Sequence, residues 1–174
     1  MMSFRSFVLS ALVVLAAGVL PGCSKKDAEV AKPAAGAKEA AVSQGDLDVV
    51  KKAHLEFDKS VTIGQALDGY KYFEKKEWLT TKSPEGARLV ILKTGMSPEY
   101  LKELNQVCSK KNPKQQKIES QQWSIQFTVN PDQTVHVSGT QTLSVLADQK
   151  KEAGSLNEEL MKSVFKNELA PVCQ

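Results

Sequence analysis

Few side chains in this sequence could carry acid–base or metal chemistry, and they are widely spaced. His54 and Glu56 are two residues apart, which places them on one face of an extended segment, and His136 is the only other histidine. Zinc sites need three or four ligands at defined spacing. Two solvated strand histidines explain this pattern better than a metal site does, so we expect no metal and no cofactor.

The motifs that mark common enzyme classes are missing from the sequence. It contains no G-x-S-x-G, no P-loop, no H-E-x-x-H and no C-x-x-C. A formal net charge of +3 is too small to indicate nucleic acid as a partner. We therefore expect a binding protein and not an enzyme, with no small-molecule substrate.

The most specific pattern is Leu20-Pro21-Gly22-Cys23, which closes a largely apolar run of 14 residues that follows Arg5. It resembles a lipobox, the cleavage and acylation site of bacterial lipoprotein precursors. The run is too short for a transmembrane helix, which needs about 20 residues. An ordinary signal peptide would require an A-x-A-like site after the run, where this sequence has the lipobox pattern.

The resemblance implies that residues 1–22 are a signal peptide and that Cys23 is the lipid attachment site, carrying a diacylglycerol and usually palmitate. Ser24 is not the aspartate that favours retention in the inner membrane. The implied location is the inner leaflet of the outer membrane, facing the periplasm. Exposure at the cell surface is the alternative that this pattern leaves open.

Residues 23–45 are expected to form the acylated cysteine and a flexible tether, because they are rich in Ala, Lys and Glu and lack aromatic residues. Residues 46–174 are expected to form a single globular domain. Its two cysteines, Cys108 and Cys173, are expected to pair as a disulfide in the oxidising periplasm. The bond would close a loop of about 65 residues and fix the carboxy terminus to a helix.

Periodicity and capping signals predict the elements of this domain. Residues 49–57 have a weak strand pattern, and Thr62-x-x-Gln65 is a capping box that opens a helix. Residues 77–81 and 88–94 flank a type I turn at Ser83-Pro84-Glu85-Gly86, which predicts a hairpin. Ser97-Pro98-Glu99 opens a second helix.

The clearest strand signal is the alternation from Gln122 to Val129, which the turn at residues 130–133 separates from a long strand. Gly139 marks a bend or bulge in that strand. A polar loop follows this strand, and Ser155-x-x-Glu158 is predicted to cap a third helix. The fold class is α+β, with an antiparallel sheet of about five strands and two or three helices on one face, in the order β-α-β-β-α-β-β-α.

Two surface features are candidates for partner binding. One is a polar sheet face that the helices need not cover, comprising Thr128, Thr134, His136, Ser138, Thr140, Thr142 and Ser144. The other is Tyr72, which lies opposite the apolar side of its helix and points outward or into a neighbouring element. A wet sheet face and a contact within the domain are the alternatives. The lysines Lys110, Lys111, Lys114 and Lys117 cluster in a loop that is either solvated or in contact with phosphate-bearing lipid or an acidic partner.

The stretch from Ser60 to Phe73, with Trp78 and Gly86 following, resembles a segment of Gram-negative lipoproteins that have no assigned activity. The element order is also similar to the helix-then-hairpin layout of beta-lactamase inhibitor proteins. We expect a membrane-anchored, non-enzymatic protein-binding module of the cell envelope. The alternative is an inhibitor or immunity protein against a periplasmic hydrolase.

Overall fold

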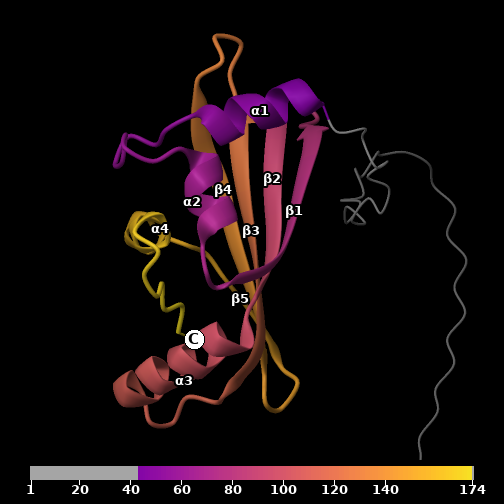
Figure 1. Cartoon of the computed structure of the whole chain (residues 1–174). Helices are drawn as coiled ribbons and strands as arrows, with labels where there is room; N and C mark the ends of the chain where they lie inside the picture. Colours follow the sequence, from indigo (N-terminus) through magenta and orange to yellow (C-terminus); the bar gives the residue numbers. More distant parts are fainter. Residues whose placement is uncertain (1–42, 174) are drawn as a thin grey trace, which may run out of the picture. The chain divides into compact units, whose positions relative to one another are not determined.

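The computed structural model describes residues 43–173, which form an antiparallel sheet with helices on one side (Figure 1). These residues form the helices α1 (Gln44–Lys52), α2 (Ile63–Gly69), α3 (Pro98–Lys111) and α4 (Glu158–Phe165). Their strands are β1 (Phe73–Lys82), β2 (Arg88–Met96), β3 (Ile118–Val129), β4 (Val135–Leu146) and β5 (Lys151–Gly154). The predicted α+β class and the antiparallel sheet are confirmed.

The sheet is a meander in which each strand pairs with the next along the chain, in the order β1-β2-β3-β4-β5. The predicted turn joins β1 to β2: the Gly86 amide donates to the Ser83 carbonyl at 2.9 Å, and Gly86 has φ +85°. That backbone conformation is easy only for glycine. Both strands are longer than the sequence pattern predicts.

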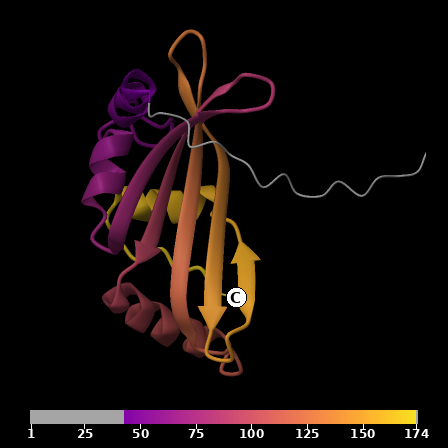
Figure 2. The ribbon, with the colours of Figure 1, turned by 90° about the vertical axis from the view of Figure 1, so that its right-hand side faces the viewer.

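The helices lie on one side of the sheet, which we call the inner face, and the opposite side is the outer face (Figures 1 and 2). Helix α1 contacts β1, β2 and β3, and α3 contacts β3. The core between the layers is aromatic at its centre. Rings of Tyr70, Tyr100 and Trp123 are each 1% exposed or less, and Trp123 makes edge contacts with Tyr100 and Phe73.

The predicted first strand over residues 49–57 is wrong, because residues 44–52 form helix α1. Leu47 and Val50 are three apart, which puts both on one face of a helix, and Val50 is fully buried. Asp46 in the first turn and Lys51 in the last turn complement the helix dipole. Packing on the sheet therefore outweighs the strand preference of the two valines.

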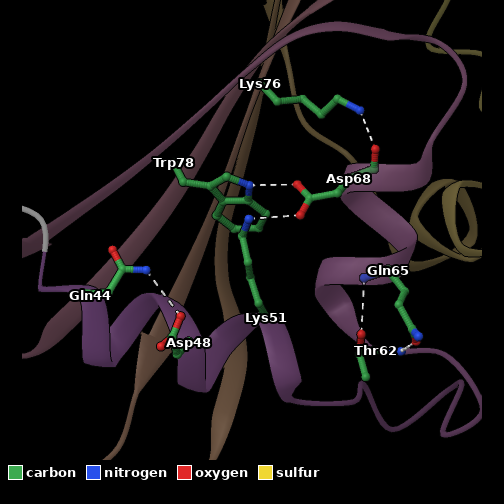
Figure 3. A network of polar contacts seen from close by, with 8 residues as sticks. All are labelled: Gln44, Asp48, Lys51, Thr62, Gln65, Asp68, Lys76 and Trp78. Carbon is green, nitrogen blue, oxygen red and sulfur yellow. Dashed lines mark hydrogen bonds and ion pairs between the residues drawn. The ribbon is translucent and has the colours of Figure 1, made fainter.

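The capping box that opens α2 is confirmed, with reciprocal bonds between Thr62 and Gln65. Asp68 on this helix joins three elements (Figure 3). Its carboxylate accepts from Trp78 Nε1 of β1 and forms an ion pair with Lys51 Nζ of α1, each at 2.9 Å. Its backbone carbonyl also accepts from Lys76 Nζ. These bonds fasten α1 and α2 to the edge strand.

Two further predictions need correction at the carboxy-terminal side. The expected polar loop contains β5, which pairs with β4 from Thr142 to Val145. The third predicted helix exists as α4, but its cap is Asn157, whose side chain accepts from the Leu160 amide. Ser155 is therefore not the cap. The observed order is α-α-β-β-α-β-β-β-α.

Cys108 and Cys173 form the predicted disulfide, with a sequence separation of 65 residues. The bond joins the last part of α3 to the carboxy-terminal segment that crosses the inner face. Closing a loop of this length stabilises a fold by about 4 kcal/mol in the chain-entropy model. The disulfide fixes the end of the chain on the helical side, so the outer face remains clear of it.

Candidate functional site

Side chains on the outer face follow from the strand register, because residues paired across a sheet point to the same side. One row runs Lys75, Gly95, Gln122, Leu143 and Ala153 across all five strands. The next row runs Glu77, Lys93, Ser124 and Gln141. In each row the side chains in the middle of the sheet are short or polar.

A hollow of about 530 Å³ lies on the outer face over these two rows. Residues of every strand line it: Lys75, Glu77, Lys93, Thr94, Gly95, Gln122, Trp123, Ser124, Gln141, Thr142, Leu143 and Ala153. The floor is low at Gly95, where an added Cβ would meet no atom within 4 Å. The hollow therefore forms where the side chains in the middle of the sheet are shorter than those on either side of them.

Apolar residues continue the outer face beyond the hollow. Leu89 pairs with Thr81 and Ile91 pairs with Leu79, and all four side chains are half-buried. The apolar run of β2 is thus divided between the two faces, since Val90 and Leu92 are fully buried on the inner one. An apolar strip therefore continues the outer face beside the hollow.

The predicted polar face does not exist as one surface, because a bulge in β4 reverses the side-chain direction. Gln126 pairs with Gly139 while Phe127 pairs with Val137, so Ser138 is the extra residue. An inserted residue exchanges the faces of everything beyond it. His136 and Ser138 are exposed on the outer side, and Thr134 is exposed in the turn before β4.

Beyond the bulge, the alternate threonines and serine of β4 lie on the inner face. Thr142 is 1% exposed and Ser144 is fully buried, where it accepts from Gln121 Nε2. Thr140 is half-buried and its hydroxyl bonds both the amide and the carbonyl of Leu156. The expectation that Thr140 and Thr142 share an exposed surface with His136 is therefore wrong.

Tyr72 packs within the domain and does not point to solvent. It is 2% exposed, and its hydroxyl donates to Glu103 Oε2 at 2.6 Å. Burial, followed by that hydrogen bond, raises the pKa of Tyr72. Lys71 Nζ lies 4.7 Å from the centroid of its ring. Tyr72, which directly precedes β1, is thus a buried contact with α3 and does not lie on an exposed surface.

The two histidines lie apart from the hollow, and neither is among its lining residues. His54 precedes α2, where its Nδ1 is 3.1 Å from the Val61 carbonyl oxygen, and His136 is exposed on β4. Across residues 43–173 no three His, Cys, Asp or Glu side chains gather as a metal site would require.

Lys110 and Lys111 form the last turn of α3, and Lys114 and Lys117 follow it, all with exposed side chains. Cys23 and the signal-peptide pattern lie outside the described residues. Within the described part of the chain, no helix is both long and apolar enough to cross a membrane.

The hollow could not be found from the sequence, because its residues come from five strands and meet only once the register is known. One usable signal was present, since Lys75 and Glu77 lie two residues apart within a charged stretch and Gly95 has no side chain. Compared with known proteins, the chain matches no family model, no curated protein and no solved structure.

Proposed function

We propose that this chain is a membrane-anchored periplasmic lipoprotein whose domain binds another envelope protein through the outer face of its sheet. The observation that carries the proposal is the hollow over β1 to β5, on the side where no described helix packs. The lining offers lysine, glutamate, amide and hydroxyl groups but neither histidine nor cysteine. This chemistry suits recognition better than catalysis.

A protein fits this surface better than a small ligand. The hollow is shallow and spans the width of the sheet, and half-buried Leu79, Leu89 and Ile91 extend the apolar area beyond it. Leu143 at its other end is 39% exposed. Small-molecule sites enclose most of their ligand's surface, whereas protein interfaces combine an apolar centre with a polar rim over a larger area.

The proposed anchor rests on the Leu20-Pro21-Gly22-Cys23 pattern. The described domain begins at Ser43, whose amide donates to Thr80 Oγ1 of β1 at 2.6 Å. About 20 residues therefore separate Cys23 from the edge strand. The composition of these residues predicts a flexible tether, and a flexible chain of that length has an average reach of about 25 Å, enough for an anchored domain to meet a partner near the membrane.

The binding proposal is tested by a photo-crosslinking residue placed in the full-length chain in cells. At Gln141, an exposed position in the hollow, we expect a reproducible adduct with one other protein. The control position is Gln106, which is equally exposed but lies on α3. Adducts of equal yield from both positions, or none from Gln141, would refute the outer face as the binding surface.

The anchor is tested separately by labelling cells with a clickable palmitate analogue. We expect the wild-type chain to incorporate label and to fractionate with the outer membrane. A Cys23→Ala variant should carry no label and should remain as uncleaved precursor. Label that persists in this variant would contradict acylation at Cys23.

A further inference from the structure

The two ends of the hollow differ in chemistry. At the β1–β2 end, Glu77 lies directly opposite Lys93, but Lys75 lies opposite Gly95, which has no side chain. Lys75 thus has no acid across from it, and this end carries one excess positive charge. At the β4–β5 end, Leu143 pairs with Ala153, so the lining there is apolar.

The distance between these ends sets the spacing of complementary groups on a partner. Lys75 and Leu143 lie in the same row on β1 and β4, three inter-strand steps apart. Each step is about 4.8 Å, which gives about 14 Å in all. An extended chain rises about 3.4 Å per residue, so residues i and i+4 are separated by nearly that distance and point to the same side.

From this match we infer that the hollow accepts an extended segment of a partner protein that crosses the strands and presents a carboxylate and an apolar side chain four residues apart. The carboxylate pairs with Lys75 and the apolar side chain covers Leu143. The low floor at Gly95 and Ser124 leaves room for the segment's backbone between them. This inference rests on the proposed function and specifies the partner's chemistry.

Lys75→Glu and Gly95→Phe test the inference in the full-length chain with the crosslinking residue at Gln141, and Lys82→Glu is the control. Lys75→Glu replaces the unpaired cation by an anion and should lower adduct yield about tenfold, because a like charge now faces the partner's carboxylate. Lys82→Glu makes the same change on the same strand outside the hollow. Its yield should stay within about twofold of the wild type.

Gly95→Phe fills the floor. The site has space for a side chain, and phenylalanine favours a strand, so we expect the domain to fold normally while the adduct is lost. Circular dichroism and retention of the disulfide check the fold. The adduct should then be digested and the crosslinked segment identified by mass spectrometry.

We expect that segment to contain an Asp or Glu four residues from an apolar residue. When this acidic residue of the partner is replaced by Lys, the Lys75→Glu variant should again form the adduct. If both the Lys75→Glu and the Gly95→Phe variants form the adduct in the wild-type yield, this inference is overturned but the proposed binding function is not. A segment without that pair, or one from a second copy of this chain, also overturns it. No wild-type adduct at Gln141 refutes the proposed function itself.

Discussion

The two faces of this sheet are built from the same strands but have different surroundings. On β2, Val90 and Leu92 are fully buried against the helices, whereas Leu89 and Ile91 point outward and remain half-buried. All four residues are apolar, so alternation along the strand gives no indication of which side faces the core. The position of the helices decides which side is the core, and the apolar residues on the other side stay half-buried on the outer face.

At the bulge around Ser138, the alternation of polar residues likewise does not indicate which of them face the core. Before it, His136 points outward, and beyond it Thr142 and Ser144 point inward although the sequence continues its alternation of polar residues. The inner face is consequently not purely apolar. It holds buried polar groups that must find hydrogen-bond partners, while the outer face can bond to water.

The largest expected difference between the faces comes from removing one large side chain on each. Trp123→Ala should destabilise the fold by about 5 kcal/mol, because it opens a cavity beside Phe73 and Tyr100 and removes the bond from Trp123 Nε1 to buried Gln121 Oε1. Leu143→Ala on the outer face should cost less than about 1 kcal/mol. Urea unfolding measures both, and comparable losses would contradict the assignment of the faces.

Alkaline pH should weaken the inner face through its tyrosines. Burial raises the pKa of Tyr70 and, to a larger extent, that of Tyr100, whose hydroxyls donate to the carbonyls of Glu168 and Ala170. Because the pKa of each tyrosine is higher in the folded than in the unfolded chain, its contribution to stability is complete below the unfolded pKa of about 10 and is lost as the pH rises above that value. At pH 11 we expect a loss of about 1.4 kcal/mol for each of the two.

Urea unfolding between pH 8 and pH 11 measures this loss, and absorbance at 295 nm reports when each tyrosine ionises. The Tyr100→Phe variant should lose about 1.4 kcal/mol less than the wild type over the same interval, because one buried hydroxyl no longer titrates. Stability that stays constant up to pH 11, or tyrosines that ionise near pH 10 while the fold persists, would contradict their burial.

The sequence predicted the elements that carry local signals. Thr62 and Ser97 cap α2 and α3 as expected, because capping depends on residues within one turn. The strand pattern around Trp123 is equally local. The strand predicted over residues 49–57 rests on the alternation of Leu55 and Phe57 with polar neighbours, which lies after α1 and does not report how Val49 and Val50 pack. Those valines prefer strands when considered alone, and packing of α1 on the sheet outweighs that preference.

The parts that the sequence could not predict depend on contacts between distant segments. Strand β5 has the sequence Lys-Glu-Ala-Gly, which carries no strand signal, and it forms because the edge of β4 offers hydrogen-bonding groups. Gly139 indicated a bulge, but the reversal of Thr140 and Thr142 follows only from the register. The hollow needs the register of every strand.

The hydrogen bond and the ion pair of Asp68 hold the helices at the edge of the inner face, and substitutions of Asp68 measure their contribution to stability. Asp68→Ala removes the acceptor of Trp78 Nε1 and the partner of Lys51, and we expect a loss of about 1.5 kcal/mol. Asp68→Asn keeps an acceptor for Trp78 and should lose about 0.5 kcal/mol. Unfolding at low and high salt separates the two terms, and equal losses in both variants would show that only the charge matters.

The smallest effects come from two inward-facing threonines of β4 whose hydroxyls differ in hydrogen bonding. The Thr142 hydroxyl is buried and has no hydrogen-bond partner among the described residues, whereas the Thr140 hydroxyl is bonded to the backbone of Leu156. Valine has nearly the same shape as threonine but lacks the hydroxyl. Thr142→Val should therefore stabilise the fold by about 1 kcal/mol, and Thr140→Val should destabilise it by a similar amount. Urea midpoints that shift in the same direction would contradict this division of roles along β4.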